Sequence, residues 1–342
     1  MPDAVAIWFA APREVQLRRE AVAMPPGSIR VAAEASGISA GSELLVYRGE
    51  APRDLPPDLP TVAGGFGLPM KFGYASVGRV VETAPGVHRP AVGDLVFAHH
   101  PHQSEYVVDA SLPVILPPDL APEVGVFTAN LETAVTVVLD AQPRFGEEVL
   151  ILGQGVVGLL VTMLLVRAGA RVIAADAYER RRGLSLRLGA ERAVSPERDL
   201  SDTVRAVTGG RGADVVIEAS GNPAALQAGI DSVAFGGTVV VASWYGARPA
   251  SLDLGRAFHR RRVRIVSSQV STLDPALSSR WTHERRTGLV MRLLTELPLA
   301  ELISHRFPLH AAPDAYELLD RDPGEAVQVV FTYDGAPGDG AR

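Results

Sequence analysis

The pattern of apolar and polar positions changes character near residue 121. Before that point, short apolar or alternating runs separated by glycine and proline predict β-strands at residues 4–9, 28–35, 75–82, 94–98 and 104–108. A proline-rich segment, 51–60, predicts a loop among them. We expect this half of the chain to form a compact, mainly β domain with turns in place of long helices.

Beyond residue 121 a long apolar helical pattern, 124–139, is followed by a regular alternation of strands and helices. Strands alternating with helices imply parallel pairing, so we expect a doubly wound sheet of the α/β class. The predicted strands are residues 147–152, 171–175, 193–194, 214–218, 238–242 and 264–267, and the predicted helices are 156–168, 179–188, 200–207 and 224–232.

The last part of the chain predicts helices at 285–294 and 312–321 and a strand at 326–332. Together these patterns place a domain boundary near residue 130.

Composition supports a globular protein of two domains, since 342 residues exceed one typical domain and 47% of them are hydrophobic. Thirty-three basic and 39 acidic residues give a net charge of −6, which argues against a nucleic-acid partner. The chain contains no cysteine, which excludes disulfides, thiolate nucleophiles, iron–sulfur clusters and zinc sites built on sulfur.

The N-terminal residues lack the basic start and apolar stretch of a secretion signal. The apolar run at 156–166 is much shorter than the roughly 20 residues of a membrane helix. We therefore expect a cytoplasmic protein without a membrane partner.

A glycine-rich motif follows the apolar strand that ends at residue 152 and opens the next helix. It consists of Gly153, Gly155 and Gly158, with Val156 and Val157 in the first helical turn. The first glycine permits a tight turn, the second lets a pyrophosphate approach the backbone, and the third lets helix and strand pack closely. The motif predicts dinucleotide binding, while a buried turn that needs glycine only for packing is the alternative.

Asp176 ends the following strand, 23 residues after Gly153. A carboxylate there accepts hydrogen bonds from ribose hydroxyls and repels a 2′-phosphate, which favours NAD as cofactor. Arg180, Arg181 and Arg182 come soon after, and Arg181 is a further candidate for cofactor contact. Because these arginines could hold a 2′-phosphate, NADP remains the alternative.

Residues 218–221 (Glu-Ala-Ser-Gly) lie at the fourth strand of the predicted sheet, and the glycine pair 236–237 lies before the fifth. With the segments 37–43, 47–49 and 73–75 of the first half, they resemble the medium-chain dehydrogenase/reductase superfamily, whose members are alcohol dehydrogenase-like. Residues 37–43 with 47–49 resemble the segment that supplies its first zinc cysteine, 73–75 its Gly-His-Glu segment, and 97–103 with 130–134 a subgroup often labelled zinc-binding dehydrogenase. The resemblance implies a β-rich GroES-like catalytic domain whose first part is residues 1–129, a dinucleotide-binding Rossmann domain in residues 130–268, and a return to the catalytic domain in residues 269–342.

This sequence departs from the superfamily's zinc ligands. Ser39 stands in place of the cysteine, Tyr74 in place of the histidine and Ala75 in place of the glutamate, while the four-cysteine structural lobe is missing. The resemblance therefore points to a zinc-free branch, and we expect no bound metal. Two alternatives stay open for His99, His100 and His102: a rebuilt zinc site completed by Glu43 or Glu132, or polar residues that solvate a loop.

Without zinc, a group that can lose and regain a proton must stabilise the charge that develops on the substrate oxygen. Tyr74, His100 and His102 are the candidate proton donors, and Glu43 could orient a histidine or bind a substrate hydroxyl. The alternatives to these catalytic roles are that Tyr74 is a buried phenol of the core and that Glu43 is a salt-bridged or solvent-facing carboxylate of a loop.

Open α/β sheets bind ligands at the carboxyl ends of their strands, which places Ser220, Ser243 and Trp244 near the cofactor. Thr133 is a further cofactor candidate. The predicted function is NAD-dependent interconversion of a secondary alcohol and a ketone on a small, polar, cyclic or polyol-like substrate. Reduction of a conjugated C=C bond and a catalytically silent dinucleotide-binding protein are the alternatives. The resemblance also implies a homodimer joined at the sheet edge near residues 264–271.

Overall fold

The computed structural model describes residues 3–62, 64–196 and 199–333. The chain divides into two compact units, one formed by residues 130–290 and the other by residues 1–129 together with those from 291 onward. The segment 269–290, which the sequence analysis assigned to the returning part of the first domain, lies in the second unit. Arg286 explains this placement, because its guanidinium donates to Thr136 Oγ1 at 3.0 Å and to the Val270 carbonyl at 2.6 Å.

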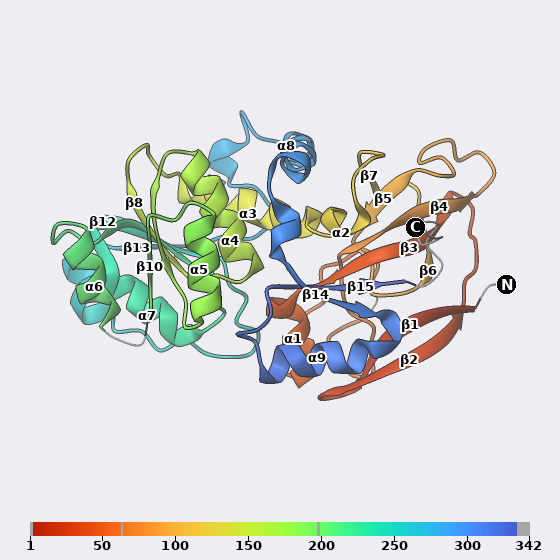
Figure 1. The fold of residues 1–342 in the computed structure, drawn as a ribbon, viewed down its shortest axis with the longest axis horizontal. Helices are drawn as coiled ribbons and strands as arrows, with labels where there is room; N and C mark the ends of the chain where they lie inside the picture. Colours follow the sequence, from red (N-terminus) through yellow and green to blue (C-terminus); the bar gives the residue numbers. More distant parts are fainter. Residues whose placement is uncertain (1–2, 63, 197–198, 334–342) are drawn as a thin grey trace. The chain divides into compact units, whose positions relative to one another are not determined.

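Figure 1 shows the second unit, with helices such as α5 (Glu179–Arg187) and α7 (Pro223–Ser232) beside its strands. These strands form a six-stranded parallel sheet in the order β10-β9-β8-β11-β12-β13. In chain order this is 3-2-1-4-5-6, the order of a doubly wound dinucleotide-binding sheet, and it confirms the predicted fold class. The strands are β8 (Glu148–Leu152), β9 (Arg171–Ala175), β10 (Arg192–Val194), β11 (Ala213–Glu218), β12 (Val233–Val241) and β13 (Arg264–Ser267).

Helices cover this sheet, and β8 is accordingly buried at every position. Its core includes Leu150, Ile173, Val216 and Val239, all at most 2% exposed. The helices of this unit are α3 (Thr128–Ala141), α4 (Val156–Arg167), α5 (Glu179–Arg187), α6 (Leu200–Val207) and α7 (Pro223–Ser232), with the π-helical turn η1 (Leu254–Phe258) and the 3-10 turn η2 (Pro275–Leu277). The chain passes from this unit to the first within α8 (His283–Glu296).

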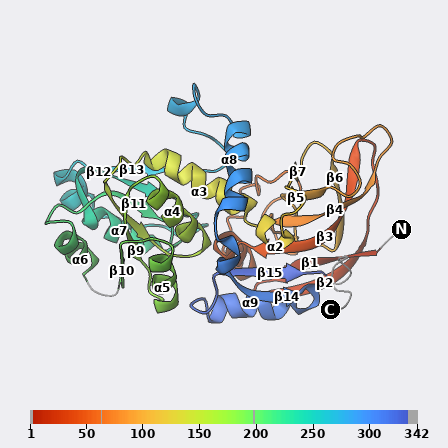
Figure 2. The ribbon, with the colours of Figure 1, turned by 45° about the horizontal axis from the view of Figure 1, so that its top comes forward.

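The first unit contains a seven-stranded mixed sheet in the order β14-β15-β3-β4-β5-β7, with β6 also paired to β3, and a separate β1–β2 hairpin. The strands are β1 (Asp3–Ala11), β2 (Glu14–Ala21), β3 (Ser28–Ile38), β4 (Ser76–Thr83), β5 (Leu95–Ala98), β6 (Glu105–Asp109), β7 (Val114–Ile115), β14 (Ile303–Pro308) and β15 (Gln328–Thr332). The helices are α1 (Ala40–Arg48), α2 (Pro122–Gly125), α9 (Ala312–Arg321) and the 3-10 turns η3 (Leu299–Leu302) and η4 (Leu309–Ala311). Figure 2 shows α9 beside β14 and β15.

Helix α1 is the main element that the sequence analysis did not predict in this unit. Its residues 43–47 are consecutive buried positions, so it lacks the periodic polar face that identifies a surface helix. It ends at Gly49, whose φ of +73° is the left-handed conformation of a helix cap. Strands β2 and β14 were also not predicted, and β12 begins five residues earlier than expected.

The stretch Pro122–Ala141, which contains α2 and α3, is long and apolar enough to cross a membrane by those two criteria alone. In the structure, 72% of its most apolar window is buried within the protein. A core helix of a folded domain has the same properties.

Candidate functional site

The glycine-rich turn joins β8 to α4, and the geometry at two of its glycines confirms the roles predicted for them. Gly153 has a φ of +93°, and a Cβ there would lie 2.6 Å from Ser220 Cα. A Cβ on Gly158 would lie 1.9 Å from the Gly153 carbonyl oxygen, so helix and strand could not pack as they do. A Cβ on Gly155 would meet no atom within 4 Å.

Packing within the protein therefore does not require a glycine at position 155. It precedes Val156 and Val157, the first residues of α4, whose N-terminal N–H groups suit a phosphate. The open space beside Gly155 fits the approach of a pyrophosphate to the backbone. This feature favours a dinucleotide cradle over a turn that uses glycine only for packing.

Asp176 follows β9 directly and is only 6% exposed. Its carboxylate accepts hydrogen bonds from the backbone N–H of Gln154 at 2.7 Å and of Tyr178 at 2.8 Å. The Arg181 guanidinium lies 3.9 Å from the same carboxylate and stacks over the Tyr178 ring. Burial lowers the pKa of Arg181, while the charge of Asp176 opposes that shift. Asp176 thus fastens the glycine-rich turn to the end of β9.

The other cofactor candidates lie where the topology predicts. Ser220 follows β11 and is exposed, and Ser243 and Trp244 follow β12, with Trp244 38% exposed. Thr133 is half-buried in the first half of α3. The structure brings Gly153, Asp176 and Ser220 to the carboxyl edge of one sheet.

In the first unit, Tyr74 belongs to a cluster of three hydroxyl groups. Its hydroxyl forms hydrogen bonds with Ser39 Oγ and, at 2.7 Å, with Ser42 Oγ, and the two serine oxygens are 3.2 Å apart. Burial raises the pKa of Tyr74, the serine hydrogen bonds oppose that shift, and the charge of Glu43 adds to it. The phenol is therefore held in its protonated form.

Behind this cluster lies Glu43, a residue of α1 with no exposed surface. Its Oε1 accepts a hydrogen bond from the Ser39 backbone N–H at 2.8 Å. Its Oε2 contacts His102 Nε2 at 2.9 Å and accepts from the Tyr316 hydroxyl at 2.5 Å. The carboxylate thereby holds the start of α1, which carries both serines of the cluster.

His102 is equally buried and extends the same network. Its Nδ1 lies 2.7 Å from Ser36 Oγ, which in turn lies 2.7 Å from the Tyr333 hydroxyl. Gly73 makes room for the ring, because a Cβ there would lie 2.9 Å from His102. Glu43 and His102 have no exposed surface, so they act through neighbouring protein groups.

His100, the third candidate donor, is 8% exposed and stacks on Tyr106 with ring centroids 4.0 Å apart. Its Nδ1 lies 2.8 Å from the Pro101 carbonyl oxygen, to which it donates. Burial lowers the pKa of His100 to about 3, so its imidazole is neutral near pH 7.

In the described part of the chain, no three His, Asp or Glu side chains are grouped so that they could hold a metal ion. The alternative of a rebuilt zinc site therefore lacks a set of ligands there. Glu132, one suggested ligand, lies 3.7 Å from the Arg286 guanidinium. Burial raises the pKa of Glu132 and Arg286 opposes that shift. The other suggested carboxylate, Glu43, is committed to the network described above.

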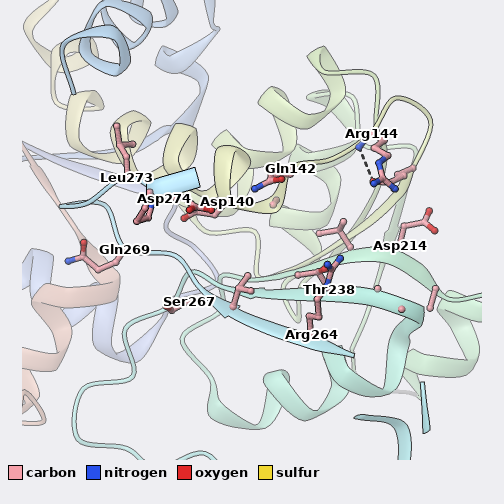
Figure 3. Close-up of a pocket in the computed structure, with 18 of the residues that line it drawn as sticks. Asp140, Gln142, Arg144, Asp214, Thr238, Arg264, Ser267, Gln269, Leu273 and Asp274 are labelled. Carbon is pink, nitrogen blue, oxygen red and sulfur yellow. Dashed lines mark hydrogen bonds and ion pairs between the residues drawn. The ribbon is translucent and has the colours of Figure 1, made fainter. Parts of the chain in front are cut away.

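A cavity of about 640 Å³ lies elsewhere in the second unit, beside the edge strand β13 (Figure 3). Asp214 and Arg264 line it from the amino ends of β11 and β13, and Asp140 and Asp274 line it from α3 and the segment before η2. It contains none of the predicted site residues. Because dinucleotides bind at the carboxyl ends of such strands, this cavity is not the cofactor site.

The structure also reveals polar residues that the sequence analysis missed: Ser36, Tyr316 and Tyr333 in the first unit, and Glu218 and Tyr245 in the second. The sequence did contain a signal for Glu218, since its carboxylate follows three apolar residues at the end of a strand and lies two residues before Ser220. Tyr316 carried none, because its partner Glu43 lies 273 residues away in sequence.

Comparisons with known proteins agree with this geometry. Residues 156–283 match the family described as zinc-binding dehydrogenase. The chain is 32% identical over 250 residues to the (R,R)-butanediol dehydrogenase of Bacillus subtilis (strain 168), covering 64% of this chain and 71% of that protein. The chain belongs to the medium-chain dehydrogenase/reductase superfamily.

Other relatives of this superfamily extend the match. The chain is 28% identical over 272 residues to the D-guloside 3-dehydrogenase of Escherichia coli (strain K12), covering 77% of this chain and 78% of that protein. A structure described as a zinc-binding dehydrogenase of Sinorhizobium meliloti 1021 bound to NADP has a TM-score of 0.78 at 23% identity, over 97% and 100% of the two chains. A structure described as a short chain alcohol dehydrogenase of Escherichia coli CFT073 complexed with NADH also has a TM-score of 0.78, at 19% identity over 96% and 99% of the two chains. These two likenesses establish the shared fold.

The environment of His100 predicts a pH-dependent loss of stability. Its pKa is 6.5 when unperturbed and about 3 in the folded protein, so between these values the unfolded chain binds a proton that the folded chain excludes. Stability must therefore fall as the pH falls through this window, by up to about 1.4 kcal/mol per pH unit. Urea unfolding of His100→Phe at pH 7, 6, 5 and 4 should show a shallower slope than the unmodified protein. His310→Gln, at an exposed histidine, is the control, and equal slopes in all three proteins would contradict the prediction.

Proposed function

We propose that the protein is an NAD(H)-dependent oxidoreductase that interconverts a secondary alcohol and a ketone on a small, polar, cyclic or polyol-like substrate. Membership of the superfamily and the glycine-rich turn support a dinucleotide-dependent oxidoreductase. The names of the two relatives, a butanediol and a D-guloside 3-dehydrogenase, support an alcohol substrate with more than one oxygen.

The observation that carries this proposal is the hydroxyl cluster of Tyr74, Ser39 and Ser42. It occupies segments that resemble the superfamily's zinc-ligand segments, but it offers proton donors in place of metal ligands. Negative charge develops on the substrate oxygen as an alcohol and a ketone interconvert, and a hydrogen-bond donor at that oxygen stabilises it.

We propose that the Tyr74 hydroxyl donates the proton that the substrate oxygen receives when a ketone is reduced. Because burial keeps the phenol protonated, it is ready to donate to the oxygen of a ketone. Ser39 and Ser42 are partly exposed, so either hydroxyl can pass its own proton to the phenolate while it takes one from solvent, which restores the phenol. Glu43, held by His102 and Tyr316, fixes the turn that carries the two serines.

The residues of the second unit suit a nicotinamide dinucleotide. The space beside Gly155 and the N-terminus of α4 would hold the pyrophosphate, and Asp176 would face the adenosine ribose. When bound, the nicotinamide ring donates or accepts a hydride. The carboxylate of Asp176 supports NAD over NADP, because it repels a 2′-phosphate.

We further propose that the reaction needs no zinc. The superfamily's sulfur ligands have no counterpart in a chain without cysteine. Ser39 and Tyr74 are poor zinc ligands beside the imidazole, thiolate and carboxylate groups that zinc prefers. The donor set fits acid–base chemistry better than metal binding.

We also propose a homodimer joined along β13, the edge strand of the parallel sheet. An uncovered edge strand offers unpaired backbone groups to other chains, and pairing two subunits removes them. The cavity of Figure 3 lies along this edge, where a partner subunit would adjoin it.

The role of Tyr74 predicts that Tyr74→Phe lowers turnover by on the order of 10²–10⁴, since the substitution removes only the hydroxyl. Binding of NADH, followed by fluorescence, should be unchanged. Turnover is measured on a panel of secondary alcohols, ketones and enones. The matched control is Tyr106→Phe, which removes a buried tyrosine hydroxyl outside the cluster of Tyr74, Ser39 and Ser42.

A loss below tenfold in Tyr74→Phe would show that the proton comes from elsewhere. Turnover of enones alone would replace the proposed reaction by C=C reduction.

Unmodified protein dialysed against a chelator should keep its activity, and activity that requires stoichiometric zinc would defeat the metal-free mechanism.

The cofactor assignment predicts that the unmodified protein binds NADH more tightly than NADPH. Asp176→Ala should weaken NADH binding and reduce the preference, because it removes the ribose acceptor and one negative charge. Calorimetric titration of both cofactors with both proteins measures this. Equal affinities in the unmodified protein would contradict the assignment.

The dimer predicts a solution mass twice the 36.2 kDa of one chain at micromolar concentration. Val266→Lys places a charge in the edge strand and should give a folded monomer, because edge charges oppose strand pairing. Light scattering with circular dichroism distinguishes the two species. A monomeric unmodified protein would end this proposal.

A further inference from the structure

Glu218 is the last residue of β11 and has no exposed surface. Its carboxylate accepts three hydrogen bonds. Oε1 accepts from the Ser220 backbone N–H at 2.8 Å and from the Ser220 hydroxyl at 2.5 Å, and Oε2 accepts from the Tyr245 hydroxyl at 2.7 Å. The donors come from two different loops, the one after β11 and the one after β12.

A buried carboxylate is costly unless donors surround it. Here the donors exist only while both loops keep their present conformation. Movement of either loop would leave an oxygen of Glu218 without its partner in a place that water does not reach. The burial of one charge therefore makes the conformations of the two loops depend on each other.

A second set of hydrogen bonds joins the same loops through Gly221. Its backbone N–H donates to Ser243 Oγ at 2.8 Å, and its carbonyl accepts from the Arg248 guanidinium at 2.8 Å. Arg248 also donates to the Tyr245 carbonyl at 3.2 Å. Both polar backbone groups of Gly221 are thus committed to the loop after β12.

The pair of loops is also held against the glycine-rich turn. The Ala219 N–H donates to the Leu152 carbonyl at 2.8 Å, and Ser220 lies so close to Gly153 that a Cβ on that glycine would clash with its backbone. The loops that follow three adjacent strands, β8, β11 and β12, therefore form one connected wall.

We propose that Glu218 and Tyr245 form a clamp that positions the nicotinamide half of the cofactor. The inference rests on the proposed function and deepens it. In this sheet Asp176 and β9 lie on one side of β8 and mark the adenosine side. The clamp lies on the other side, where the loops after β11 and β12 face the second half of a dinucleotide. Glu218 and Tyr245 are positioning residues that act through Ser220, Gly221 and Ser243.

The test compares two ligands that share the adenosine half. Tyr245→Phe and Glu218→Gln should each weaken NADH binding by on the order of tenfold, because each removes a hydrogen bond to a buried charge or the charge itself. AMP binding should be unchanged in both, because AMP does not reach the clamp. The two effects should be strongly non-additive, with the double variant close to Glu218→Gln alone.

Ser232→Ala is the matched control. It removes a buried hydroxyl that donates to the Ala228 carbonyl at 2.7 Å at the end of α7, away from the carboxyl ends of the strands. It should alter neither NADH nor AMP affinity. If Glu218→Gln does not fold, Tyr245→Phe, which changes one atom, still carries the comparison.

Hydrogen exchange gives a readout that needs no cofactor. In Tyr245→Phe the backbone amides of residues 219–222 and 243–246 should exchange faster together, while those of β9 keep their rates. Equal NADH-to-AMP affinity ratios in all variants, or unchanged exchange in both loops, would overturn the clamp. An unmodified protein that fails to bind NADH would instead overturn the proposed cofactor, with the exchange experiment still reporting on the clamp.

Discussion

The parallel register of β8 with its two neighbours is the constraint on which the dinucleotide-binding half of the structure depends. Leu152 lies opposite Ala175 of β9 and opposite Glu218 of β11. The next residue of each strand begins a loop, and these residues are Gly153, Asp176 and Ala219. A shift of one residue would turn every side chain of a strand to the other face of the sheet. It would also separate the glycine-rich turn from the backbone of Ser220, against which it packs.

The sequence predicted this half of the fold well, because its signals are local. An apolar strand, three spaced glycines and an acidic residue after the next strand lie within about 30 residues, as a βαβ unit requires. Helix α1 escaped prediction because tertiary packing buries residues 43–47 in succession, which erases helical periodicity. The hydrogen bond between Tyr316 and Glu43 escaped for another reason. It joins residues 273 positions apart, and no local pattern connects them.

Among the catalytic candidates, the sequence predicted three residues that the structure brings together. Tyr74, Glu43 and His102 do belong to one connected region, joined through Ser39. Residue type alone, however, cannot tell which groups reach a ligand. His102 and Glu43 have no exposed surface, whereas Tyr74 is only partly buried. Burial depends on packing by distant segments such as α9, so the difference in exposure between Tyr74 and the two groups behind it appears only in the folded chain.

Glu43 and Glu218 illustrate one physical device used in both units. Each is a fully buried carboxylate that accepts three hydrogen bonds from protein groups. Loss of a single donor to a buried charge costs about 1.5–3 kcal/mol, a large fraction of the stability of a typical domain. Such an acceptor therefore disfavours every loop conformation that withdraws a donor. It adds little net stability, because burying the charge offsets much of what the hydrogen bonds contribute. What it supplies is a single conformation for the start of α1, and for the loops after β11 and β12, where the proposed chemistry requires fixed hydroxyl and backbone groups.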